Sequence, residues 1–474
     1  MVTSLVTLQK PMDISVDDIE AELREIWHNY ASDGSGGVAT RATTVSVIIY
    51  EPEEIQQLLA ALGFYTNPID GEHGPATRGA IATAQQTYGL PITNRVDQAT
   101  LKRLRAEFRA LPAEKRQFKN ADLRGFSLNE ALAAQNPCRV ITLCPTFDDE
   151  DTGVTAQVSA YCPVNKGSGS RLVCCEYITL RGTKQALDRV DTLVKSLVIA
   201  DLPKFVWWKA TPNPEQLLFQ SMVDVSNCII LDSSYYGDPE SELLKIHQLV
   251  ANGTKVADLN WYRLAPWQEL SAASFDPPER RKAMLEMDQI GIAYEKGNAA
   301  QALLYLGWLA SRLDWQPEDY KSEGGDYDLR RITLNGNKHS RSIDVELAAI
   351  PVADVGEVLG DLTGLRMSST NLEANCCTIL CSETAGCMRM ESGGGAQSCY
   401  IQEVTAISDQ RSDLLLEQQL QRWGEDVLFE ADICQNHPGA WQRLFVFPRI
   451  SHDHVTIQIA KGYSGSQTSN GWGL

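Results

Sequence analysis

The 474-residue sequence has no apolar run as long as a membrane-spanning helix, and it has a deficit of basic residues. Lys and Arg number 42 against 61 Asp and Glu, which gives a net charge of −19. Such a molecule repels phosphate backbones and anionic lipid, so we predict no nucleic-acid partner and no membrane partner. The first residues also lack the charged and apolar regions of a signal peptide, and we expect a cytoplasmic protein.

Common signatures of catalysis are missing as well. The sequence contains no phosphate-binding Gly-x-x-x-x-Gly-Lys-Ser/Thr loop, and no Gly-x-Gly-x-x-Gly follows an expected strand. It also lacks the Gly-x-Ser-x-Gly elbow and the His-Glu-x-x-His pair. His452 and His454 alternate on one face of an expected strand, but no third ligand is evident. We therefore predict no catalytic residues, no cofactor and no metal site.

The twelve cysteines do not form a zinc site, because none occurs in a Cys-x-x-Cys pair. Cys381 and Cys387 instead bracket a short polar loop that ends in glycine, which would bring the two α-carbons within disulfide range. We hypothesise a thiol redox switch at this pair; two ordinary thiols at the mouth of a hairpin are the alternative. Six other cysteines lie in apolar surroundings and are expected to be buried thiols: Cys138, Cys144, Cys162, Cys174, Cys175 and Cys228.

The order of patterns predicts an α/β N-terminal domain with a mixed sheet over 1–51 and 120–325, and an α+β C-terminal domain over 326–474. Short β-branched runs at 44–50, 138–143, 204–208 and 228–231 read as strands that alternate with amphipathic helices. The segment 261–315 reads as helical throughout. If 204–208 is a strand, Trp207 and Trp208 point to opposite faces, which leaves one indole available as an interface anchor.

Residues 52–112 form a compact helical module between the first two of these strands. Leu62-Gly63-Phe64, the Asp70-Gly71-Glu72-His73-Gly74 loop and the ending from Asp97 to Leu101 resemble the three-helix peptidoglycan-binding-like family. Gln85-Gln86 departs from that family's usual Phe-Gln pair. We therefore predict an insertion inside a βαβ crossover, acting as a spacer or docking domain without affinity for peptidoglycan.

Two longer segments carry a second resemblance. The Leu202 to Trp208 strand, with its Trp-Trp pair, and the Asp258 to Trp267 run Asp-Leu-Asn-Trp-Tyr-Arg-Leu-Ala-Pro-Trp are similar to the glucose-6-phosphate dehydrogenase assembly family OpcA, in the form carried by oxygenic photosynthetic bacteria. The resemblance implies a non-catalytic partner of that dehydrogenase, which promotes its active oligomer or conformation and transmits redox state from thioredoxin. The candidate partner-binding residues on these segments are Trp207, Trp208, Asp258, Trp261, Arg263 and Trp267.

Two other classes of protein remain as alternatives. A cell-wall-binding or hydrolytic protein would use the inserted module, but it would need an export signal and a hydrolytic centre. A redox enzyme would need a Cys-x-x-Cys pair or a dinucleotide fingerprint. Both alternatives lack the residues that they require.

Overall fold

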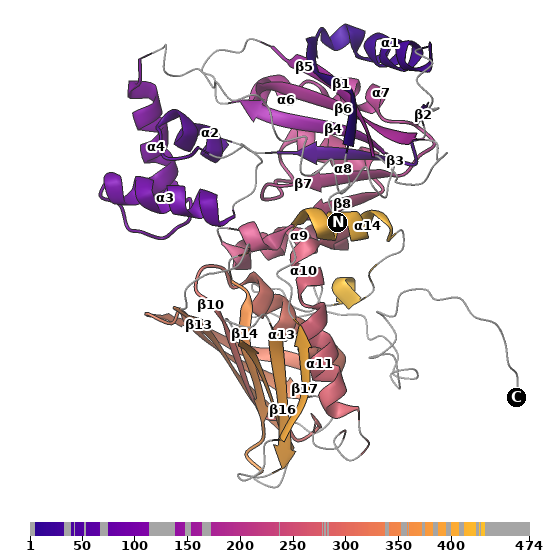
Figure 1. Cartoon of the computed structure of the whole chain (residues 1–474). Coiled ribbons are helices and arrows are strands. Elements are labelled where there is room, and N and C mark those ends of the chain that lie inside the picture. Colours follow the sequence, from indigo (N-terminus) through magenta and orange to yellow (C-terminus); the bar gives the residue numbers. More distant parts are fainter. Residues whose placement is uncertain are drawn as a thin grey trace, which may run out of the picture.

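The structure is a computed structural model in which two large sheets lie one beyond the other, with a small helical unit at the side of the first (Figure 1). It describes residues 5–32, 39–41, 43–51, 54–66, 74–112, 138–146, 153–163, 172–236, 238–276, 278, 281, 284–336, 341–351, 358, 360–371, 375–382, 387–394, 400–406, 412–422, 426 and 428–431. The candidate metal ligands His452 and His454 lie outside these residues.

The first sheet runs in the order β1-β5-β6-β4-β3-β7-β8-β9, and β2 also pairs with β6. Six of its strands are parallel neighbours, from β6 through to β9. Every residue of β3 and β8 is buried, which is typical of parallel strands covered on both faces. The strands are β1 (Leu5–Ile14), β2 (Ala39–Arg41), β3 (Val45–Tyr50), β4 (Cys138–Thr146), β5 (Thr155–Pro163), β6 (Leu172–Thr183), β7 (Lys204–Trp208), β8 (Cys228–Leu231) and β9 (Val256–Asp258).

Several helices on this sheet begin at a capping side chain. Ser15 accepts a hydrogen bond from the Asp17 amide, and α1 (Ile19–Ser32) follows. The segment 184–197 forms two helices, α6 (Lys184–Leu187) and α7 (Asp191–Leu197), with an irregular turn between them. The others are η3 (Ser233–Tyr235), α8 (Leu217–Val225), which packs on β7, and α9 (Pro239–Ala251), which packs on β9.

The connection from β3 to its parallel neighbour β4 contains the helical unit: α2 (Glu54–Ala61), α3 (Pro75–Thr87) and α4 (Gln98–Ala110). These helices share an apolar core of their own that includes Leu58, Ile81 and Leu104. Gly63 ends the first helix with a φ of 82°, where a side chain would be strained. The Asp97 carboxylate caps α4 at the Thr100 amide.

The second sheet runs β11-β12-β13-β10-β14-β15-β16-β17. The prediction that 261–315 is helical throughout is wrong, because β10 is a central strand between β13 and β14. The flanking helices are α10 (Leu259–Arg263), α11 (Ala265–Phe275) and α13 (Ala300–Leu313). The strands are β10 (Gln289–Glu295), β11 (Trp315–Gly324), β12 (Leu329–Gly336), β13 (Arg341–Ile350), β14 (Leu362–Ser368), β15 (Asn375–Ser382), β16 (Cys387–Gly394) and β17 (Tyr400–Ala406).

One apolar core passes from the first sheet to the second without a break. It contains residues from both sheets and from α14 (Ser412–Leu420), a helix that returns from the end of β17 to the first sheet (Figure 1). The two halves therefore share a core, whereas the helical unit has a separate one.

Candidate functional site

The carboxyl edge of the parallel strands is the part of this fold where a ligand is expected first. Taken in chain order, the six parallel strands have the spatial order 3-2-1-4-5-6, with β3 as strand 1 and β7 as strand 4. This is the order of doubly wound dinucleotide-binding folds. In these folds the ligand lies beyond the carboxyl ends of the strands, at the point where the strand order reverses. Here that point lies between β3 and β7.

A buried ion pair occupies this switch point. Glu51 follows β3 and Lys209 follows β7, and Lys209 Nζ lies 2.8 Å from Glu51 Oε1 with both side chains at most 7% exposed. The same ammonium lies 4.1 Å from the centre of the Trp207 ring. The sequence after β3 is Glu51-Pro52-Glu53-Glu54, with no glycine before Gly63. The position that holds pyrophosphate in dinucleotide-binding folds is therefore acidic and has no glycine-rich turn.

A second buried cluster lies at the ends of β8 and β9. Asp232 follows β8 and receives two hydrogen bonds of 2.8 Å from the Arg263 guanidinium, one to each carboxylate oxygen. Ser412, at the start of α14, donates to Asp232 at 2.9 Å and accepts from Arg263. Burial is the largest single influence and would raise the pKa of Asp232, but the Arg263 charge and the hydrogen bonds from Arg263, Ser234 and Ser412 together outweigh it, and the pKa is lowered.

Asp258 is the carboxylate of this cluster without a cation of its own among the described residues. Its Oδ1 accepts from the Ser233 and Asn260 amides, both at 3.0 Å, whereas Oδ2 has no hydrogen-bond partner in the described part of the chain. Burial, followed by the charge of Asp232, raises its pKa to about 6. This carboxyl group is therefore poised to bind a proton near neutral pH.

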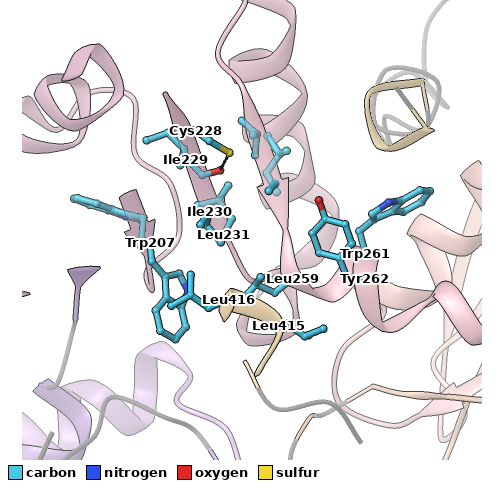
Figure 2. Packing of buried hydrophobic residues seen from close by; sticks show 14 of the residues in the cluster. Trp207, Cys228, Ile229, Ile230, Leu231, Leu259, Trp261, Tyr262, Leu415 and Leu416 are labelled. Atoms are coloured by element: carbon cyan, nitrogen blue, oxygen red, sulfur yellow. Dashed lines mark hydrogen bonds between the residues drawn. The ribbon is translucent and has the colours of Figure 1, made fainter. Parts of the chain in front are cut away.

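The helix α14 covers this end of the sheet. Leu415 and Leu416 are buried, and Figure 2 shows their segment beside Leu259 at the start of α10. Phe429, beyond the helix, lies 5.7 Å from Trp261 between ring centres. The carboxyl edge at β8 and β9 is thus filled by the chain's own side chains.

The predicted partner-binding residues lie in this interior. The exposed fraction is at most 3% for Trp207, Trp208, Asp258, Trp261 and Trp267, and it is 8% for Arg263. The expectation that one indole of β7 is exposed is wrong, because both indoles of this central strand are buried, one on each face of the sheet. Trp208 stacks on Tyr50 with ring centres 3.8 Å apart. None of the six side chains has the exposed surface that direct contact with a partner requires in this conformation.

Seven of the twelve cysteines can be compared with the predictions. An eighth, Cys162, was also expected to be a buried thiol, but its side chain lies outside the described residues. Cys138, Cys144, Cys175 and Cys228 are buried free thiols, as predicted. Cys174 is buried too, but the prediction of a free thiol is wrong because it forms a disulfide. Cys381 and Cys387 lie at the facing ends of the hairpin of β15 and β16, where the register pairs Cys381 with Met388 and Ser382 with Cys387. The two positions are one register step apart.

Several residues of the buried clusters were not predicted. Lys209 and Asp232 directly follow expected strands, so a search for polar residues at strand ends would have selected them. Ser412 is 180 residues from its partner Asp232 and carries no local signal.

Comparison with known proteins places the chain. Residues 129–248 match the family description "Glucose-6-phosphate dehydrogenase subunit N-terminal domain", and residues 254–433 match the corresponding C-terminal domain. The "Putative OxPP cycle protein OpcA" of Synechococcus elongatus is 54% identical over 432 residues, which cover 91% of this chain and 96% of that protein. The chain belongs to the OpcA family. Its relative of the same name in Nostoc punctiforme is 50% identical and covers the same 91% of this chain and 94% of that protein.

Two further comparisons concern the parts of this OpcA-family chain. Residues 50–104 match the "Putative peptidoglycan binding domain" family, a range that includes α2, α3 and the first part of α4. An NAD-binding protein from Listeria innocua has a similar structure over 52% of this chain and 77% of its own, at 9% identity and a TM-score of 0.33. Within the described residues, no helix combines the length and the apolar character needed to cross a bilayer.

Proposed function

We propose that this chain is a non-catalytic effector that binds glucose-6-phosphate dehydrogenase and promotes its active oligomer or conformation. The observation that carries the proposal is that two family descriptions naming a subunit of this dehydrogenase match the chain over both sheet-containing halves. An effector of this kind needs a surface with different affinities for two states of its target. It needs no substrate pocket.

The filled carboxyl edge supports a role without catalysis. In a doubly wound dehydrogenase this edge would receive the dinucleotide, yet here it holds the Glu51–Lys209 pair and the Asp232–Arg263–Ser412 cluster. In each ion pair the acidic and the basic side chain contact each other, and all four side chains are buried. The fold thus retains a dinucleotide-binding topology while its ligand position serves as core.

We also propose that the chain relays thiol redox state through Cys381 and Cys387, with thioredoxin as the reductant. Neighbouring strands place positions one register step apart at α-carbon separations of roughly 6 Å, within the range of a disulfide. Adjacent positions of a strand belong to opposite faces of the sheet, so a disulfide between these two requires the end of the ladder to change. Oxidation and reduction would therefore favour different hairpin conformations.

The hairpin of β15 and β16 is connected to the Asp232 cluster through two neighbouring elements. Both β15 and β16 pack against α11, which directly follows α10 and its Arg263. On its other side the hairpin continues through β17 to α14, which carries Ser412. A change at the hairpin would thus act on two elements that meet at Asp232.

The test is to measure the KM of glucose-6-phosphate dehydrogenase for its sugar phosphate with and without this chain, in oxidised and reduced conditions. We expect the chain to change the KM by about fivefold or more, with different values in the two thiol states. Cys381→Ser and Cys387→Ser should remove the difference between the thiol states, while Ser382→Ala in the same hairpin should keep it. No change of KM in either thiol state would refute the effector role. If the KM still differs between the thiol states in the Cys381→Ser and Cys387→Ser variants, the relay is refuted.

The match to a peptidoglycan-binding family keeps one alternative open, a chain that binds cell wall through the α2 to α4 unit. Sedimentation of the full chain with purified peptidoglycan tests it. We expect the chain to remain in the supernatant, and co-sedimentation would favour the cell-wall alternative.

A further inference from the structure

In the helical unit, the turn at residues 93–95 faces the rest of the molecule. Gln85 on α3 is fully buried, and its amide nitrogen donates to Thr93 Oγ1, the Arg95 carbonyl and Thr100 Oγ1 at 2.8 to 2.9 Å. Its amide oxygen accepts from the Thr93 and Asn94 backbone amides. One side chain therefore fixes the whole turn, including Asn94 in the left-handed region at a φ of 56°.

Arg95 extends from this turn to both halves of the molecule. Its guanidinium donates to the carbonyl oxygen of Tyr236, in the N-terminal half after η3, at 2.6 Å. It also donates to the carbonyl oxygen of Gly297, in the C-terminal half between β10 and α13. A planar guanidinium presents donors in a fixed fork, which suits it to hold two acceptors at once.

The segments that carry the two acceptors also make contacts that do not involve Arg95. Asn298, which is 2% exposed, donates its side-chain amide to the carbonyls of Ser233, Ser234 and Tyr236 at 2.7 to 3.3 Å. Gly360 closes on the same residue, since a Cβ there would lie 2.0 Å from the Asn298 carbonyl oxygen. The junction of the two halves is therefore closely packed and hydrogen-bonded, and it presents both carbonyls to Arg95.

Charge acts in the same direction as these hydrogen bonds. Burial is the largest influence and lowers the pKa of Arg95, and Glu242 on α9 and Asp328 before β12, one from each half of the molecule, act against it by favouring the charged form. Apolar packing gives less guidance, because the helical unit and the rest of the molecule have separate apolar cores. The polar contacts of Arg95 thus contribute to the orientation of the unit on the molecule.

We propose that Arg95 is an anchor that holds the peptidoglycan-binding-like unit against the junction of the two halves, so that its 93–95 turn binds this chain's own backbone carbonyls. The ligand of the turn is then internal: the carbonyl oxygens of Tyr236 and Gly297, flanked by two carboxylates. The unit moves with the molecule as one body while the anchor is engaged.

The test uses the full chain with spin labels on unnatural amino acids at two exposed positions, Gln86 on α3 and Lys321 on β11. Pulsed electron resonance should give one narrow distance for the parent chain. Arg95→Glu should lower the docked-to-undocked ratio by about a hundredfold or more, because a third carboxylate then faces two carboxylates and two carbonyls. The narrow distance should give way to a broad distribution.

Two controls keep the result interpretable. Lys102→Ala removes an exposed cation from α4 of the same unit and should leave the distance narrow. Hydrogen exchange of α3 reports whether the unit itself stays folded; if Arg95→Glu lowers its protection, Arg95→Lys, which keeps the charge but not the fork, replaces it and should broaden the distance less. A narrow, unshifted distance in a folded Arg95 variant would overturn the proposal, whatever the chain does to the dehydrogenase.

Discussion

The two sheets of this molecule solve the burial problem in different ways. The N-terminal sheet is covered on both faces, and β3 and β8 are buried at every residue. In the C-terminal sheet the burial alternates along β12 and β13, so that one face is apolar and the other carries exposed polar residues. The difference means that a polar side chain has opposite consequences in the two sheets. In the first it must be paired inside a core, and in the second it is solvated.

Two arginines give the largest expected contrast. Arg263 is buried and paired with Asp232, so Arg263→Ala leaves a carboxylate without its cation and should lower the free energy of unfolding by about 3–5 kcal/mol. Arg331 on β12 pairs with Glu323 and Glu346 at 3.2 Å but is about half exposed, so Arg331→Ala should cost less than ~1 kcal/mol. Urea unfolding measures both. Equal losses for the two variants would contradict the contrast.

Two serines, one in each sheet, test the same contrast with a smaller expected effect. Ser46 in β3 is fully buried and accepts a hydrogen bond from the Ile199 amide, whereas Ser342 in β13 is exposed. Ser46→Asp places a carboxylate in a covered parallel strand and should cost about 2–4 kcal/mol. Ser342→Asp should change stability by less than ~0.5 kcal/mol. A loss of similar size at Ser342 in thermal unfolding would show that the outer face of this sheet is covered.

The same difference explains which strands could be predicted from the sequence. The strands at 204–208 and 228–231 were predicted with the observed bounds, since a strand covered on both faces is a short continuous apolar run. In contrast, β11 has the sequence Trp-Gln-Pro-Glu-Asp-Tyr-Lys-Ser-Glu-Gly. Its many exposed polar and charged residues give no apolar pattern from which a strand could be predicted. The central strand β10 was absorbed into the helical prediction because it lies between two helical segments.

The residues of the candidate site could be predicted from the sequence only in part. Family-like motifs selected Asp258, Trp261 and Arg263, and the structure brings Asp258 and Arg263 into one cluster. Their burial could not be predicted, because charged residues are rarely fully buried unless they are paired. The partner of Arg263 is 31 residues away, and the contacts of Arg95 are 141 and 202 residues away. Only the folded chain shows such pairs.

The smallest expected effect concerns pH and the unpaired oxygen of Asp258. Its pKa is about 6 in the folded chain against an ordinary value of 3.8, so the folded state holds this proton more tightly than the unfolded state does. The stabilisation from the protonated carboxyl is therefore complete below about pH 4 and is lost as the pH rises through about 6. Asp258→Asn keeps the shape and the acceptor for two amides but cannot ionise. We expect this variant to gain on the order of 1–2 kcal/mol relative to the parent chain between pH 4.5 and pH 7.

Unfolding by urea at several pH values measures this difference directly. Asp232 in the same cluster acts in the opposite sense, because its lowered pKa gives a stabilisation that is lost as the pH falls. Both chains retain Asp232 and Arg263, so the difference between parent and variant reports Asp258 together with its coupling to Asp232. Asp344→Asn, on the exposed face of β13, is the matched control and should follow the parent curve. If Asp258→Asn also runs parallel to the parent from pH 4.5 to pH 7, the cluster at the carboxyl edge must hold Asp258 ionised in the folded chain. The lone oxygen would then have a partner of its own, and this edge would be as fully paired as the Glu51–Lys209 site beside it.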